Sequence, residues 1–190
     1  MSAFKRMIGD SVKGIVERLR KRKEDAKRAV QNAKKRQESI EESIKHVSNA
    51  MSLGNFENAE KMAKNLSLSG QEMKKAAIKA LAHMIVYHDY EKIKAAVKRY
   101  GIDDDDQSYA AAKAYAKCMN LRYYGDAIQI AEDFGMEDSK KDPAIMLIQR
   151  YLRHGMKNEA REIAKKHSLE KEFGKMLKSI NAISRPRHCC

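Results

Sequence analysis

The chain has 190 residues, of which 43% are hydrophobic and 34% are charged, with nine glycines, two prolines and no tryptophan. Soluble domains average about 25% charged residues and about 12% glycine plus proline, so turn-forming residues are too few here for a β-sandwich or β-barrel. The formal net charge of +13 favours polyanionic partners but does not bear on the fold. We therefore expect an all-α protein that buries a core without disulfides or metals.

Targeting segments and cysteines point to the cytoplasm. Every uncharged run is far shorter than the roughly 18 residues that a membrane-spanning helix needs, and the start of the chain lacks an apolar signal-peptide core. Residues 4–23 are basic, acid-poor and amphipathic, which leaves an organelle transit peptide as the alternative. The three cysteines, Cys118, Cys189 and Cys190, are too few for a disulfide framework, so we expect reduced thiols.

Residues 1–52 predict one long, basic, amphipathic helix. Apolar residues recur three and four positions apart, which places them on one helix face. That face is thin where Ala26, Ala29 and Ala33 replace large side chains, so we expect its middle to be exposed or loosely packed. The first 50 residues carry 14 Lys and Arg against 7 Asp and Glu. The candidate polyanion-binding side chains are Lys5, Arg6, Lys13, Arg18, Arg20, Lys21, Arg22, Lys23, Lys27 and Arg28.

Residues 53–184 repeat themselves. Similar segments that each open a helix begin at Asn55, Asp89, Tyr123 and Met156, with offsets of 34, 34 and 33 residues. Each of these helices is closed by a small residue followed by an apolar one, at Ser67, Gly101, Gly135 and Ser168. Further helical runs cover residues 73–87, 108–123, 143–154 and 170–184. A period in the low thirties with two helices per unit predicts an αα-hairpin repeat domain over residues 53–184.

Several of these segments resemble known helical repeats. Residues 54–59 and 155–164 resemble the turn and second helix of tetratricopeptide (TPR) units, and residues 114–118 and 144–148 are similar to first helices of pentatricopeptide (PPR) units. The resemblance implies a TPR-like αα-hairpin solenoid. The pattern departs from TPR at Leu81, Tyr115 and Ile148, where such units usually carry a small residue.

The same resemblance implies two specialised ways of binding a ligand, and the residues present fit neither of them. PPR units read single-stranded RNA with a polar residue that here would be Ile78, Ala112 or Ile145. TPR units that grip a carboxylate use Lys and Asn, which Ala82 and Ala116 cannot replace. We therefore predict an apolar groove for an amphipathic helix, from a partner or from this chain's own first helix, with ordinary core as the alternative. Its residues are Ile78, Ala82, Ile85, Ala112, Ala116, Met119, Ile145 and Leu152.

Catalytic and metal-binding patterns are absent from the sequence. It contains no phosphate-binding glycine loop, no metalloprotease motif, no nucleophile elbow and no paired-cysteine motif. The acidic run 103–106 predicts a helix start, with Asp104 as the cap and Gln107 as its reciprocal partner. We expect no enzyme activity, no cofactor and no metal.

Two classes of function remain. The first is a non-catalytic adaptor or scaffold that binds another protein through TPR-like repeats and docks with its basic helix. The alternative is an RNA- or ribosome-associated factor whose basic helix contacts phosphates. Peripheral binding to an anionic membrane ranks third, because residues 4–23 lack Trp and Tyr anchors. Homo-oligomerisation stays open, and residues 185–190 are expected to be a disordered tail.

Overall fold

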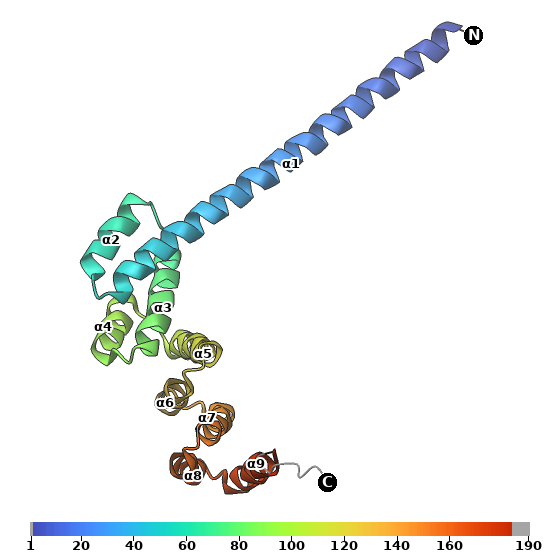
Figure 1. The fold of residues 1–190 in the computed structure, drawn as a ribbon. Helices are drawn as coiled ribbons and strands as arrows, with labels where there is room; N and C mark the ends of the chain where they lie inside the picture. The colour runs from blue at the N-terminus through green and yellow to red at the C-terminus, as the bar shows by residue number, and fades with distance from the viewer. Residues whose placement is uncertain (1, 184–190) are drawn as a thin grey trace, which may run out of the picture.

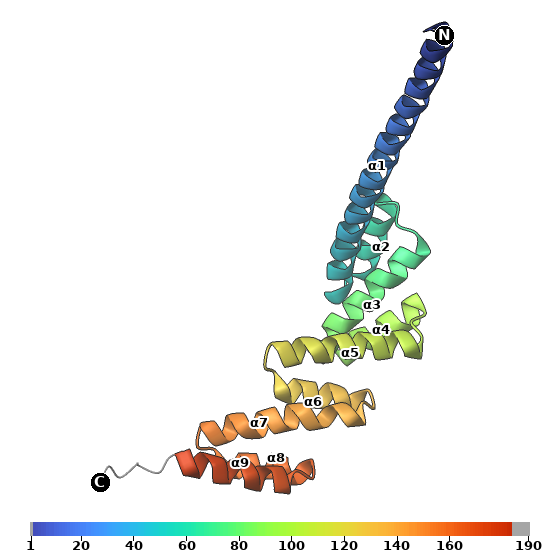
Figure 2. The ribbon, with the colours of Figure 1, turned by 90° about the vertical axis from the view of Figure 1, so that its right-hand side faces the viewer.

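The computed structural model describes residues 2–183, and the side chains of residue 17 and residues 19–180. Every regular element within 2–183 is a helix and none is a strand, which confirms the all-α prediction (Figures 1 and 2). The elements are α1 (Ser2–Ser52), α2 (Phe56–Asn65), α3 (Gly70–Val86), α4 (Tyr90–Tyr100), α5 (Asp104–Asn120), α6 (Tyr124–Asp133), the 3-10 helix η1 (Glu137–Lys140), α7 (Lys141–Arg153), α8 (Lys157–Lys166) and α9 (Glu170–Ile183).

Helix α1 divides into a docked part and a projecting part. At its C-terminal end, Ile44, Val47 and Met51 are buried against α2 and α3. Every described side chain from residue 19 to residue 39 is exposed, as expected for the alanine-rich middle of this helix. Figure 1 shows this part of α1 extending away from the other helices. The docked turns therefore share the core of the helical body, and the first helix does not fold back over the remaining helices.

The remaining helices form two rows. Helices α3, α5, α7 and α9 lie along one side and α2, α4, α6 and α8 along the other (Figure 1). Within the first row, α3 packs directly against α5 and α7 against α9, but α5 and α7 make little direct contact. The docked end of α1 packs against α3. The hydroxyl of Tyr115 on α5 instead donates to the carbonyl oxygen of Ser139 in η1 over 2.8 Å. The partly buried tyrosine ring thus occupies a position where a small residue would allow a closer approach.

The turns repeat with the same period as the sequence. Left-handed residues end the first helix of each pair at Gly54, His88, Arg122 and Gly155, and the second helix at Ser67, Gly101, Gly135 and Ser168. Both series are spaced by 34, 34 and 33 residues. Each turn carries a backbone hydrogen bond spanning five residues, such as Leu68 N to Ala63 O at 2.9 Å, which satisfies a carbonyl at the helix end. The predicted closing residues are therefore confirmed as helix ends.

The start of α5 corrects a detail of the sequence prediction. Its cap is Asp103, whose Oδ1 accepts from the amide of Asp106 at 2.9 Å, rather than Asp104. Asp103 adopts the extended backbone that a cap requires, which leaves Asp104 inside the first turn. Lys74 of α3 binds both Asp103 and Asp106, at 3.0 and 2.6 Å. The acidic run therefore starts a helix and joins α5 to α3.

Small residues let the two rows approach each other. Ala59, Ala127 and Ala160, which open the second helix of three pairs, are fully buried. The buried apolar side chains form two clusters, one shared by α1 to α6 and the other by α6 to α9. Helix α6 contributes Ile130 to the first cluster and Ile128 to the second. The core is therefore elongated along the rows.

Candidate functional site

Exposed side chains recur along α3, α5 and α7 in three matching rows. Residues four apart lie on the same helix face, and all twelve of these side chains are exposed. The rows are Lys75, Lys79, His83 and Tyr87 on α3 and its C-cap; Tyr109, Lys113, Lys117 and Leu121 on α5 and its C-cap; and Asp142, Met146, Arg150 and His154 on α7 and its C-cap. We call these rows, with Arg122, Tyr123 and Arg153, the basic face.

Tyrosine rings lie among the cations of the basic face. The Nζ atom of Lys113 is 5.0 Å from the ring centroid of Tyr109, and that of Lys117 is 6.0 Å from the ring centroid of Tyr87. The second contact joins α5 to the end of α3. The rings of His83 and Tyr87 are 4.7 Å apart. The exposed side chains of α3 and α5 therefore form one continuous surface on which lysines lie beside aromatic rings.

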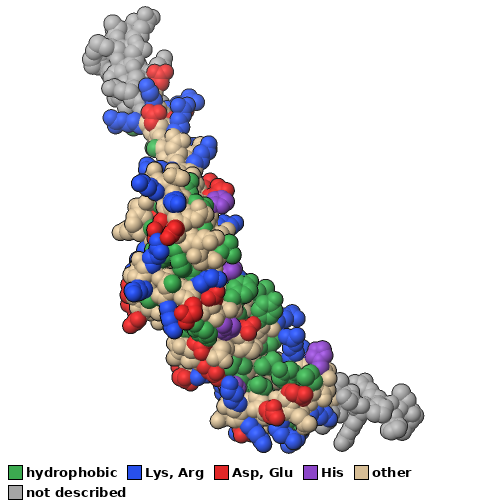
Figure 3. Space-filling view, turned by 90° about the vertical axis from the view of Figure 1, so that its left-hand side faces the viewer, with side chains coloured by type: hydrophobic (Ala, Val, Ile, Leu, Met, Phe, Trp, Pro, Cys, Tyr) green, Lys and Arg blue, Asp and Glu red, His purple; other side chains and the backbone are tan. Residues whose placement is uncertain are grey.

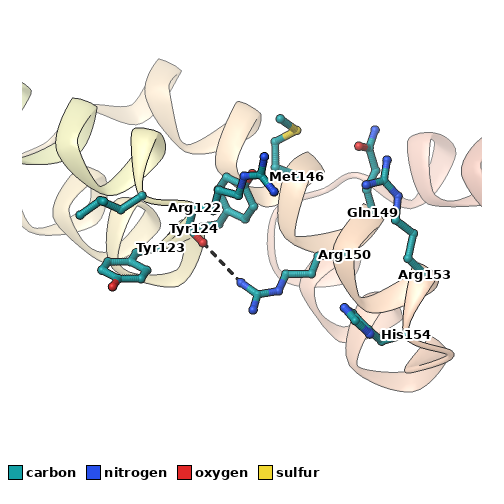
Figure 4. A pocket seen from close by; sticks show the side chains of 9 residues that line it. Arg122, Tyr123, Tyr124, Met146, Gln149, Arg150, Arg153 and His154 are labelled. Carbon is teal, nitrogen blue, oxygen red and sulfur yellow. Dashed lines mark hydrogen bonds between the residues drawn. The ribbon is translucent and has the colours of Figure 1, made fainter.

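A cavity extends the basic face toward α7. It has a volume of about 600 Å³ and lies between the α5–α6 turn and α7 (Figure 4). Among the described residues no Asp or Glu lines it; the lining residues are Leu121, Arg122, Tyr123, Tyr124, Met146, Gln149, Arg150, Arg153 and His154. One guanidinium nitrogen of Arg150 donates to the carbonyl oxygen of Arg122 over 3.4 Å. That bond ties α7 to the turn beside it.

An open hollow of about 630 Å³ continues along α5. Its lining includes the apolar side chains of Ala112 and Ala116 and the ammonium groups of Lys113 and Lys117. Leu121 lines both the hollow and the cavity. The two concave regions thus meet at the end of α5.

Several cations of the basic face have no carboxylate partner within the described part of the chain. Five of them form no ion pair with any carboxylate among the described side chains: Lys79, Lys113, Lys117, Arg150 and Arg153. Partial burial and the nearby charge of Lys117 lower the pKa of His83 below its usual range. The surface therefore carries positive charge that is not neutralised by these side chains and that an anionic ligand would neutralise.

The chain matches no protein-family model, no curated protein and no solved structure.

The predicted polyanion-binding residues lie elsewhere, on α1. The side chains of Lys5, Arg6, Lys13 and Arg18 fall outside the described residues. The other six, all exposed on the projecting part of α1, are Arg20, Lys21, Arg22, Lys23, Lys27 and Arg28. Within this group Arg20 pairs with Glu24 at 3.7 Å. These cations are close together along one helix, but they are not part of the basic face.

The predicted apolar groove is not a single surface. Ile85 and Leu152 are buried in separate core clusters, so the ordinary-core alternative applies to both of them. Four more groove residues are partly buried against these clusters: Ile78, Ala82, Met119 and Ile145. Ala112 and Ala116 are exposed and line the hollow on α5. Three exposed residues of the basic face come directly after groove residues in the chain: Lys79, Lys113 and Met146. Lys79 and Lys113 are 34 residues apart, which is the repeat offset. Basic residues that recur at this spacing are the sequence signal from which the face could have been predicted.

Throughout the described part of the chain, no helix is both long enough and apolar enough to cross a bilayer. Among the same residues, no group of three or more His, Cys, Asp or Glu side chains is placed to hold a metal ion. Cys118 is a buried free thiol whose pKa is raised, chiefly by burial.

Proposed function

We propose that this chain is a non-catalytic binding protein with a TPR-like solenoid of αα-hairpins, and that its basic face binds single-stranded nucleic acid, with RNA as the favoured ligand. The turns that recur every 33 or 34 residues support the repeat architecture. The observation that carries the binding proposal is the set of exposed cations without ion pairs on α3, α5 and α7, two of which lie over exposed tyrosine rings.

Both parts of a single-stranded nucleic acid match this surface. Lysine and arginine neutralise phosphates and release their counterions, which gives affinity without sequence preference. Unpaired bases stack on aromatic side chains, at about 1–3 kcal/mol for each base. Tyr87, Tyr109 and Tyr123 are about half exposed or more, so their rings are accessible to bases. The cavity beside Tyr123 adds Arg122 and Arg150 as phosphate contacts.

An adaptor that binds another protein is the second candidate. Its support is the hollow on α5, where Ala112, Ala116 and Leu121 provide an apolar floor between lysines. An acidic amphipathic segment would fit such a surface. The pairing of lysines with tyrosine rings favours nucleic acid over an acidic protein segment. Carboxylates need only the cations, whereas unpaired bases also use the rings.

The test measures salt dependence of binding to a labelled single-stranded oligouridylate by fluorescence anisotropy. Replacing Lys113, Lys117 and Arg150 together by Gln should flatten the slope of log affinity against log salt by about two units, at about 0.7 per lost phosphate contact. The matched control replaces Lys61, Lys98 and Lys165 by Gln; these are exposed cations on α2, α4 and α8. An equal change in both variants, or no binding by the parent protein, would reject the basic face as the site.

A further inference from the structure

The projecting part of α1 carries the same apolar seam as its docked part. Residues along one side of α1 alternate spacings of four and three, as in a coiled-coil heptad. The d positions are Leu19, Ala26, Ala33, Ile40 and Val47, and the a positions are Lys23, Val30, Gln37, Ile44 and Met51. The last three seam residues are buried in the body of the protein. The buried end therefore shows which side of α1 is built to be covered.

From residue 19 to residue 39, on the N-terminal side of Ile40, no other part of the described chain covers the seam. Leu19 is 59% exposed and Val30 is 70% exposed. A shallow concavity beside Val30 is also lined by Lys23, Ala26, Lys27, Gln31 and Lys34. The projecting helix is supported by only weak ion pairs along it, such as Lys34 with Glu38 at 4.0 Å. Since most helical stability in proteins comes from packing an apolar face, this seam lacks its packing partner.

The charges that flank the seam select the kind of partner. Five of the six flanking e and g positions are basic and none is acidic: they are Arg20, Arg22, Lys27, Ala29, Lys34 and Arg36. The acidic residues Glu24, Asp25 and Glu38 occupy the outer b and c positions. A second copy of α1 would place cation against cation in either a parallel or an antiparallel pair, which opposes self-association.

We propose that residues 19–40 form one strand of a heterotypic coiled coil with an acidic partner helix. The partner's a and d residues cover the seam, and its carboxylates at e and g pair with the flanking cations of α1. Lys23, a charged residue at an a position, favours an acidic residue opposite it and so helps to set the register. This inference rests on α1 alone and is independent of nucleic-acid binding by the basic face.

The experiment titrates the full-length protein with a synthetic helical peptide that has Leu at d, Glu at every e and g position, and Ile at a except for one Glu opposite Lys23. Its control is a peptide of identical composition whose order is scrambled to destroy the heptad. We expect the heptad peptide to bind and the scrambled peptide to bind much more weakly, because only the first can cover the seam.

Two variants locate the contact. Val30→Asp places a charge in the seam and should weaken peptide binding by about a hundredfold. Asn32→Asp makes the same charge change at an outer c position and should alter affinity by no more than about threefold, since exposed charges are screened. Both residues are exposed, so circular dichroism should show the same thermal unfolding for both variants. Oligouridylate binding by the basic face should also be unchanged, which separates this inference from the proposed function.

Several results would overturn the proposal. Equal binding of the scrambled and heptad peptides would make α1 a general polyanion site. A dimer of the full-length protein that Val30→Asp dissociates, observed by sedimentation, would make a second copy the partner. Displacement of the heptad peptide by oligouridylate in a Lys113, Lys117 and Arg150 triple Gln variant would assign α1 to nucleic acid instead.

Discussion

The two long faces of the helical body use their cations differently. Along α2, α4, α6 and α8, carboxylates join neighbouring helices: Arg99 binds Glu60 at 2.7 and 3.0 Å, and Lys166 binds Glu132 at 3.2 Å. Figure 3, viewed from this side, shows acidic side chains distributed among basic ones. On the basic face, Lys113, Lys117 and their neighbours have no such partners among the described residues. Charges neutralised within the chain serve its structure, whereas the others are available to a ligand.

The lack of ion pairs on the basic face has little effect on the stability of the fold. The side chains of Arg99 and Glu60 are about 40% exposed, so solvent screens their attraction. An exposed pair of this kind contributes little to the free energy of unfolding. Omitting such pairs from the basic face therefore leaves stability almost unchanged. The core residues between the two rows, and not the surface charges, hold the helices in register.

The largest effect is expected where the two rows meet. Ala127 is fully buried, so Ala127→Leu should lower the free energy of unfolding by about 1–3 kcal/mol through overpacking. Chemical denaturation measures the change, with the exposed Ala112→Leu as the control of equal volume change. A denaturation midpoint equal to that of the parent would mean that the rows are not separated by close packing at this alanine.

A smaller effect should couple stability to binding on the basic face. Lys117→Glu removes a cation next to His83 and introduces a carboxylate that can pair with Lys113. Relief of like-charge repulsion should raise the free energy of unfolding by about 0.3–0.5 kcal/mol, while affinity for oligouridylate falls. Such opposite changes are typical of surfaces maintained for function.

The control for this variant is Lys165→Glu, at an exposed position on α8. It should leave oligouridylate binding nearly unchanged. Equal losses of binding in the two variants would show that net charge alone, and not the basic face, determines affinity.

The smallest effect is a pH dependence of binding. Burial and Lys117 lower the pKa of His83, so the free protein holds this imidazole neutral at pH 7. A bound phosphate would raise that pKa, and binding would then take up protons. Affinity for oligouridylate should therefore rise by about twofold between pH 7.5 and pH 6. In His83→Gln this rise in affinity should be smaller than in the parent protein. An unchanged pH profile in the variant would place His83 away from the ligand.

Local features of the fold could be predicted from the sequence. Asn55, Asp89, Tyr123 and Met156 each precede a helix as expected, because turns and helix starts depend on residues that are neighbours in the chain. The exposed middle of α1 followed from its alanines.

The candidate site could not be predicted in the same way. The repeat period identifies a unit but does not show which side of a helix faces the next unit, so Ile85 was assigned to a surface although it is buried. The cavity beside Arg150 depends on the separation of α5 and α7, where Tyr115 reaches Ser139, 24 residues away. A contact over that distance in the chain has no local sequence pattern.

The left-handed turns have a consequence for engineering. Ser67, His88, Arg122 and Ser168 adopt positive φ without being glycine, which costs each residue about 1 kcal/mol relative to glycine. Three of these residues are not part of the cavity lining, whereas Arg122 is. Glycine at positions 67 and 168 should therefore produce a more heat-resistant scaffold whose basic face is untouched. His88 differs, because its ring lies 3.7 Å from the carboxylate of Asp126 and glycine would remove that contact. The strain at Arg122 would remain, as the energetic cost of keeping a guanidinium beside the cavity.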